Sequence, residues 1–175
     1  MKNIFFFLTL MAVFLSGAAS AKDNHQQYRL GSGDEIRINV FGEITLSGKF
    51  LVGDEGVVAM PLIGGIQAEG LTVQELENAI KAKLKPDYLK NPRVSVEVLN
   101  YRPFYILGEV NSPGSYPFVS GMTVLEGVAL AGGFTYRAKK GKVYIRRAGS
   151  QDEVLILVTE IVLPGDIITI RERIF

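Results

Sequence analysis

The stretch GLTVQELENAI (residues 70–80) decides the fold, because its opening is repeated further along the chain as GMTVLEGVAL (residues 121–130). The offset is 121 − 70 = 51 residues. In each copy the threonine, Thr72 or Thr123, can cap a helix, and the glutamate three residues later can reach back to the cap's backbone N–H. This repeat predicts two helices that begin at equivalent positions in two related units.

Apolar residues follow each predicted cap at helical spacing, so one face of each helix should contact a core. A Gly-Gly pair after the second helix is suited to end it. The residues expected to face the two cores are Val73, Leu76, Ile80 and Leu84 in the first helix and Val124, Leu125, Val128 and Ala129 in the second.

The segments around the helices alternate apolar and polar residues, which is the period of half-buried strands. We expect strands at EIRINVF (35–41), VSVEV (94–98), KVYIRR, EVLILV and DIITI. Two hairpins are also expected. One pairs 50–52 with 57–60 around Asp54-Glu55-Gly56, and the other pairs FYILGEV with SYPFV through a type II turn at Pro113-Gly114. The predicted fold class is α+β, with two small sheet-plus-helix units.

A second repeat brackets the chain. Gly33-Asp34 precedes the first strand and Gly165-Asp166 precedes the last. Glycine before aspartate is typical of turns, because glycine accepts a positive φ and aspartate bonds its own nearby backbone.

The first residues predict a secretory leader over residues 1–21. Lys2 supplies a positive charge, an apolar run from Ile4 to Leu15 is too short to span a bilayer, and Ala19-Ser20-Ala21 ends with a cleavage signal. Residues 22–27 are expected to be a flexible N-terminus of the mature chain.

Composition excludes several classes of function. Without Lys2 the mature chain carries 19 − 1 = 18 basic residues against 18 acidic ones, so nothing argues for nucleic-acid binding. The chain has no cysteine, which excludes a disulfide, a thiolate metal site and a lipid anchor on cysteine.

Residues suited to catalysis are few, so we expect no enzyme activity, no catalytic residues, no cofactor and no metal. The single histidine, His25, lies in the polar segment after the leader. Asp34, Asp54 and Asp166 could be considered as carboxylates for glycosidic cleavage, but each belongs to a Gly-Asp turn, and the structural interpretation is favoured.

One segment, FTYRAKKGKVYIRR (134–147), interleaves cations with aromatic residues. Aromatic rings there could stack on sugars while cations meet acidic groups, or the segment could simply be a solvated loop and strand. The expected contacts for a glycan or a partner protein are Phe134, Tyr136, Arg137, Lys139, Lys140 and Lys142.

An ordered run of motifs resembles the bacterial polysaccharide export proteins of the outer-membrane auxiliary type. The run comprises GDE (33–35), PLIG (61–64), GLTV, NPRVSV (91–96), GEVNSPG (108–114) and AGG (131–133). The second half is similar to the family's soluble ligand-binding β-grasp module. The expected organisation is a leader at 1–21, a polysaccharide export domain at 28–100 and the β-grasp domain at 101–175.

The resemblance implies a periplasmic subunit of a capsule or exopolysaccharide export machine, associated with the outer membrane through its partners. Such subunits would form a homo-oligomeric ring, guide polysaccharide outward and contact an inner-membrane copolymerase.

The sequence departs from longer family members in two ways. Ala18 stands where they carry a lipidated cysteine, and the sequence given ends at Phe175 without their C-terminal membrane helix. We therefore expect a separate outer-membrane β-barrel partner. The alternative function is a monomeric periplasmic module that binds or senses glycans.

Overall fold

The computed structural model describes residues 28–85 and 87–173. The predicted leader and the segment 22–27 lie outside the described residues. In chain order the elements are β1 (Glu35–Val40), η1 (Ile44–Leu46), β2 (Gly48–Leu51), β3 (Val57–Met60), β4 (Gly64–Gln67), α1 (Val73–Leu84), β5 (Val94–Asn100), β6 (Phe104–Gly108), β7 (Gly114–Tyr116), α2 (Val124–Leu130), β8 (Lys142–Arg146), β9 (Glu153–Leu157) and β10 (Ile167–Ile170).

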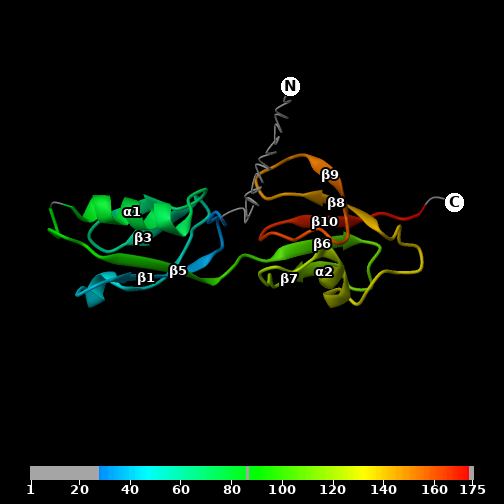
Figure 1. Cartoon of the computed structure of the whole chain (residues 1–175), viewed down its shortest axis with the longest axis horizontal. Helices are drawn as coiled ribbons and strands as arrows, with labels where there is room; N and C mark the ends of the chain where they lie inside the picture. The colour runs from blue at the N-terminus through cyan, green and yellow to red at the C-terminus, as the bar shows by residue number, and fades with distance from the viewer. Residues whose placement is uncertain (1–27, 86, 174–175) are drawn as a thin grey trace, which may run out of the picture.

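The two units lie end to end and are joined by the segment between β5 and β6 (Figure 1). The first contains a three-stranded sheet of order β2-β1-β5, a two-stranded sheet β3-β4, and α1. The second contains a five-stranded sheet of order β7-β6-β10-β8-β9, with β6 and β10 parallel, and α2 on one face. Each unit has its own buried apolar cluster. The α+β prediction is confirmed.

Helix α1 begins as its sequence predicted. The Thr72 hydroxyl accepts the Glu75 backbone N–H at 3.2 Å, and the Glu75 carboxylate accepts the Thr72 N–H at 2.8 Å. Leu76, Ile80 and Leu84 are fully buried against the sheet of the first unit. The hydrogen bond from Thr72 is the main reason that the pKa of Glu75 lies below its usual range.

Helix α2 has the same capping box at Thr123, but the face predicted to contact the core is partly wrong. Val124 and Val128 are buried, whereas Leu125 and Ala129 are exposed. The third buried position is Gly127, where an added Cβ would lie 3.0 Å from the ring of Phe104. The helix therefore turns its smallest residue toward the largest core side chain, which a pattern of apolar residues does not reveal.

The first predicted hairpin is also wrong. The turn at 54–56 exists, with Gly56 at φ +73°, but the strands beside it pair with other partners. β2 pairs with β1, and β3 pairs with β4. β4 was hard to predict, because Gly64-Gly65 has low β propensity.

The second predicted hairpin is confirmed as β6–β7, but not its type II turn. Gly114 lies within β7 and is not among the glycines with positive φ. Gly108 is the residue that turns, at φ +86°, and its Cα faces the Ile170 carbonyl so closely that a side chain has no room.

Candidate functional site

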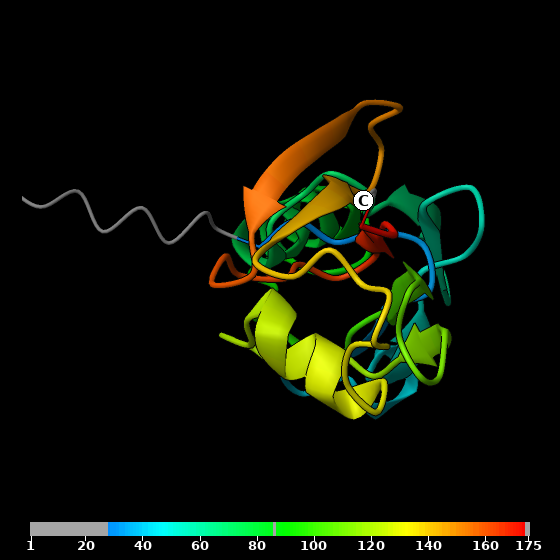
Figure 2. The ribbon, with the colours of Figure 1, turned by 90° about the vertical axis from the view of Figure 1, so that its right-hand side faces the viewer.

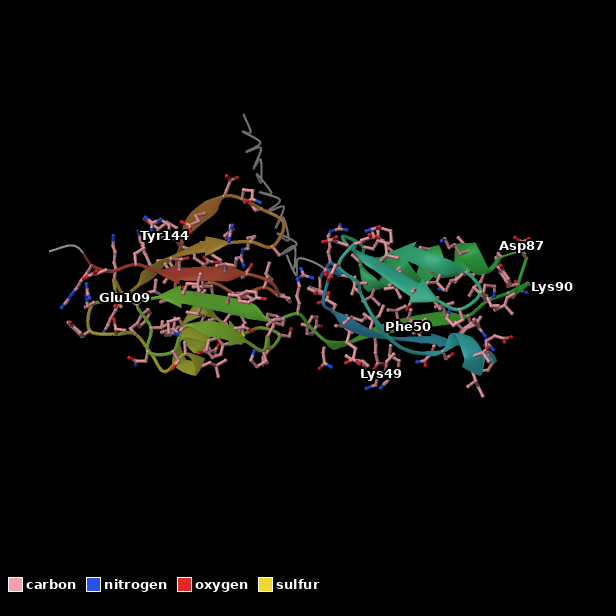
Figure 3. All side chains as sticks on the ribbon, turned by 180° about the vertical axis from the view of Figure 1, so that it is seen from behind. Lys49, Phe50, Asp87, Lys90, Glu109 and Tyr144 are labelled. Atoms are coloured by element: carbon pink, nitrogen blue, oxygen red, sulfur yellow. The ribbon has the colours of Figure 1, made fainter. Side chains whose placement is uncertain are left out.

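The basic loop, residues 134–142, lies at the end of the second unit that is farther from the first. It is held by backbone hydrogen bonds to the segment after β10: Lys139 N–H donates to the Arg171 carbonyl at 2.9 Å, and Arg173 N–H donates to the Arg137 carbonyl at 2.8 Å. Tyr144 of β8 and Glu109 mark this end in Figure 3. The loop is thus tied to a segment that follows it by about 30 residues in sequence, 171 − 139 = 32 for the first bond.

The six predicted contact residues fall into two groups: two whose side chains already make contacts within the chain, and four that face solvent. Phe134 is half-buried, packs against the core of the second unit and bridges to Val110. The Arg137 guanidinium bonds the Glu172 carboxylate, and that hydrogen bond raises the pKa of Arg137. Neither side chain is therefore open to a ligand without losing an existing contact.

The other four residues face solvent. Tyr136 has 81% of its surface exposed, and Lys139, Lys140 and Lys142 are also exposed. Their placement permits contact with a glycan or with another protein, and the prediction that they make such a contact remains untested.

A cavity of about 220 Å³ lies beside the loop and contains residues that the sequence interpretation left out. Its lining is Lys139, Tyr144, Arg171, Glu172 and Arg173. The Arg171 guanidinium lies 3.6 Å from the centroid of the Tyr144 ring and also bonds Glu153 at 3.0 Å. Arg171 and Arg173 directly follow the predicted strand DIITI. Their position after this strand was the one feature of the sequence that could have indicated their contact with the loop.

The chemistry of the cavity lining is mainly cationic. Three of its five lining residues are cations, and the Tyr144 ring fixes the orientation of one of them. A second, larger hollow of about 420 Å³ in the first unit is lined by residues of β1, η1 and β2, and its lining includes both acidic and basic residues, such as Glu43 and Lys49.

The three aspartates considered for catalysis are separated in the structure. Asp54 is exposed in its turn, while Asp34 and Asp166 are buried. Asp34 accepts the Gly31 N–H at 2.8 Å, and Asp166 accepts the Leu163 N–H at 2.6 Å, so both close the predicted Gly-Asp turns. Within residues 28–85 and 87–173, no group of three acidic or histidine side chains is placed to hold a metal ion.

Arg102, in the segment between the units, contacts both of these turns. Its backbone N–H and guanidinium donate to the Asp34 carboxylate at 2.9 and 3.2 Å. Its side chain also covers Gly31 and lies next to Gly165, where an added Cβ would be 2.7 Å from Nε. Arg102 therefore connects the Gly33-Asp34 turn of the first unit to the Gly165-Asp166 turn of the second.

Aromatic rings extend this junction. Tyr28 packs edge-on against Tyr101, which packs edge-on against Phe118 of the second unit, at centroid distances of 4.9 and 5.3 Å. Burial and the 2.5 Å hydrogen bond that the Tyr28 hydroxyl donates to Asp34 raise the pKa of Tyr28 well above its ordinary value.

Comparison with known proteins identifies the class to which these two units belong. Residues 22–99 match the model of the polysaccharide biosynthesis/export protein family, and residues 103–158 match the SLBB domain model. The chain belongs to the polysaccharide biosynthesis/export family.

Two relatives place it more closely. It is similar to the exopolysaccharide production protein ExoF of Rhizobium meliloti (strain 1021), with 36% identity over 78% of this chain and 35% of that protein. It is also similar to the polysialic acid transport protein KpsD of Escherichia coli, with 30% identity over 61% of this chain and 19% of that protein. The chain thus spans about a third and about a fifth of their lengths.

No helix within the part of the chain that the structure describes is both long and apolar enough to cross a membrane. The family model and both relatives are described as polysaccharide export, production or transport proteins.

Proposed function

We propose that the mature chain is a periplasmic subunit of a capsule or exopolysaccharide export machine, in which copies form a ring that helps conduct polymer to the outer membrane. The observation that carries the proposal is the pair of consecutive family matches, each lying on a separately packed sheet-plus-helix unit. The leader predicted at 1–21 supports a location outside the cytoplasm. The domain boundaries at 28–100 and 101–175 are part of the proposal.

The partners follow from the same role. An inner-membrane copolymerase would hand over the polysaccharide, and an outer-membrane β-barrel would receive it. The proposed polymer or partner contact is the solvent-facing part of the basic loop with the adjoining cavity. Arg171 and Lys139 there can bond acidic groups, and the exposed ring of Tyr136 can stack on a sugar.

The test is deletion of the gene, followed by measurement of polymer at the cell surface and in the periplasm. We expect the surface polymer to fall and to recover when the full chain is supplied again. Normal surface polymer in a strain that has no second copy of the gene would refute the proposal.

The second candidate is a monomeric periplasmic module that binds or senses glycans, and the cation-lined cavity is the observation that favours it. Light scattering of the purified mature chain separates the two candidates. A monomer at micromolar concentration that binds acidic oligosaccharide would support the module, whereas an oligomer supports the export subunit.

A further inference from the structure

The five-stranded sheet of the second unit is apolar on both of its faces. Its inner face forms the core beneath α2, where Ile106, Ile145 and Ile168 are buried. Residues of a strand point alternately to the two faces, so their neighbours in sequence point outward. A sheet that packs one face on a core and leaves the other in water normally has polar side chains on the second face. The outer face of this sheet departs from that rule.

An apolar row crosses the outer face of the sheet. Leu107, Thr169, Tyr144 and Leu155 lie side by side on β6, β10, β8 and β9, in that order. Tyr105, Leu107 and Leu155 are 41%, 45% and 46% exposed. Large apolar side chains that remain exposed side by side mark an interaction surface. We call the outward-pointing apolar residues the sheet face: Tyr105, Leu107, Tyr144, Leu155 and Leu157.

Helix α2 provides a second exposed apolar surface, on its side turned away from the sheet. Leu125 and Leu130 are 48% and 53% exposed, and Ala129 is exposed as well. Ile161 is also exposed and lies beside the start of the helix, where it forms a bridge to Thr123. We call Leu125, Ala129, Leu130 and Ile161 the helix face.

The two faces lie on opposite sides of the second unit. Helix α2 packs on the inner side of the sheet, with Gly127 against Phe104 and Ile106 of β6. Its exposed side therefore points away from the sheet, and the sheet face points the other way. Figure 2 shows α2 on one side of the unit, with β9 on the far side.

The first unit has the same two layers, but its outer surfaces are mainly polar. Every exposed residue of α1 larger than alanine is polar. In the three-stranded sheet, Arg37 lies between Lys49 and Glu97 at the centre of the outer side. Exposed Phe41 and Leu51 lie only at its margin, after β1 and at the end of β2. A pair of apolar outer surfaces is thus a property of the second unit and not of both.

The sheet face has a positive rim. Lys142 and Arg146 point outward from β8, and Glu153 points outward from β9, opposite Arg146. Arg171, just beyond β10, lies on the Tyr144 ring and bonds Glu153. Three cations against one carboxylate leave a net charge of 3 − 1 = +2.

The helix face has a negative rim. Glu126 is exposed on α2, and Glu160 is exposed beside the helix start, where its carbonyl accepts the Val124 N–H. Arg147 also reaches this segment, but the buried carboxylate of Asp166 matches its charge. The net charge is therefore −2 + 1 − 1 = −2. Packing one face on the other brings unlike charges together.

We propose that copies of this chain stack side by side through their second units, with the helix face of one copy on the sheet face of the next. A helix packed on a sheet is the arrangement that each unit already has inside, so stacking continues the alternation of layers. The occupant is a second copy, because one chain supplies both surfaces and their opposite rims.

This contact joins two different surfaces and is therefore heterologous. Each copy in a pair keeps one face free for a further neighbour, and repetition of the contact gives a ring where the rotation between copies closes. The inference rests on the ring of the proposed function and names the contact that would build it.

Light scattering of the purified mature chain against concentration tests the two faces. We expect oligomers whose apparent dissociation constant rises about tenfold or more in Leu125→Lys/Leu130→Lys and equally in Leu107→Lys/Leu155→Lys. Ser95→Lys, on the polar outer side of the first unit, is the control and should leave the oligomers unchanged. Circular dichroism shows whether each variant folds. A natural chain that is monomeric throughout, or an oligomer that neither double variant weakens, would refute the stacking.

A mixture of the two double variants shows whether the contact is heterologous. Each variant alone should be monomeric, whereas the mixture should form 1:1 dimers and nothing larger. The reason is that the helix-face variant keeps its sheet face and the sheet-face variant keeps its helix face. A mixture that stays monomeric at the concentrations where the natural chain assembles would overturn the proposal.

Engineered cysteines test proximity, because the natural chain has none. With a short bismaleimide linker, Leu125→Cys and Leu155→Cys should cross-link when mixed and should form few dimers separately. Asn78→Cys mixed with Asn39→Cys, on the outer surfaces of the first unit, is the matched control and should give little product. Cross-linking of either single variant alone as efficiently as the mixture would indicate a two-fold contact and would contradict the stacking.

The double lysine variants also separate this inference from the proposed function. If they are monomeric and surface polymer remains normal, the stacking contact stands and the need for a ring in export does not. If deletion of the gene leaves surface polymer unchanged, the export role fails, while the mixing experiment still decides the contact.

Discussion

The two Gly-Asp turns at the ends of the chain are locally alike and differ in their surroundings. Asp34 and Asp166 each follow a glycine with positive φ, are fully buried, and accept an N–H from three residues earlier. Each also pairs with an arginine, Arg102 at 3.2 Å or Arg147 at 2.5 Å. Local sequence therefore produced the same turn twice.

The two aspartates differ in the number of hydrogen bonds that their carboxylates accept. Asp34 accepts further hydrogen bonds from the Tyr28 hydroxyl and the Arg102 backbone. Asp166 leaves one carboxylate oxygen, Oδ1, buried with no partner in the described part of the chain, and burial raises its pKa. The turn is thus encoded by local sequence, whereas the number of partners that stabilise its aspartate depends on distant contacts, such as those of Asp34 with Arg102 between the units.

The largest expected effect is that of Asp34→Asn. It would leave the Arg102 guanidinium without its carboxylate in a site that is largely closed to water, so we expect the free energy of unfolding to fall by about 3–5 kcal/mol. Chemical denaturation measures the loss. Asp54→Asn, in an exposed turn, should change it by about 0.5 kcal/mol or less, and an equal loss in both variants would contradict the role of the junction.

Next in size are the glycines before the two aspartates. Both Gly33→Ala and Gly165→Ala place a side chain at positive φ, which costs about 1–3 kcal/mol. Gly165→Ala should cost more, because its Cβ would lie 2.7 Å from Arg102 Nε and 3.0 Å from Ala148 Cβ, whereas the nearest atom to the Gly33 Cβ is at 3.6 Å. Equal denaturation midpoints would show that Arg102 does not press on the second turn.

Asp166→Asn should cost less than Asp34→Asn, about 1–2 kcal/mol at most, and its effect should depend on pH. Since the folded state raises the pKa of Asp166, it holds the proton more firmly than the unfolded state does. Stability from this group is therefore present below the ordinary carboxyl pKa of about 3.9 and declines as pH rises. Relative to the natural chain, the variant should gain stability from about pH 4 towards pH 7, and a difference that stays flat would refute this.

The smallest effect concerns the two helix caps. Thr72→Ala and Thr123→Ala should each cost about 1 kcal/mol, because each removes one acceptor for a helix N–H. The loss should be greater at Thr72, which is only 4% exposed. Thermal unfolding of the two variants, with Thr72→Ser and Thr123→Ser as controls, measures both; serine should retain most of each cap.

Much of the fold could be predicted from the sequence because its signals are local. The capping boxes, the alternating strands and the Gly-Asp turns depend on residues a few positions apart. The incorrect predictions concern strand pairing and the buried face of α2, which depend on residues far apart in the sequence. β2 pairs with β1, where the partly buried Phe50 lies opposite the buried Ile36 and packs against the first core. α2 places Gly127 inward because Phe104 fills the space.

The candidate site was less predictable for the same reason. The loop from 134 to 142 was visible as a basic and aromatic segment, but its orientation comes from backbone pairing with 171–173. That pairing engages Arg137 with Glu172 and brings Arg171 onto Tyr144, while Phe134 is partly buried where it bridges to Val110. No periodicity in either segment indicates that they meet.

The buried phenol of Tyr28 gives the junction a natural optical label. The chain has seven tyrosines and no tryptophan, and an exposed phenol loses its proton near pH 10. The Tyr28 proton is retained beyond that point, as long as the ring stays enclosed beside Asp34. A late step in the absorbance of tyrosinate during alkaline titration would therefore report the opening of the enclosure around Tyr28, without any added dye.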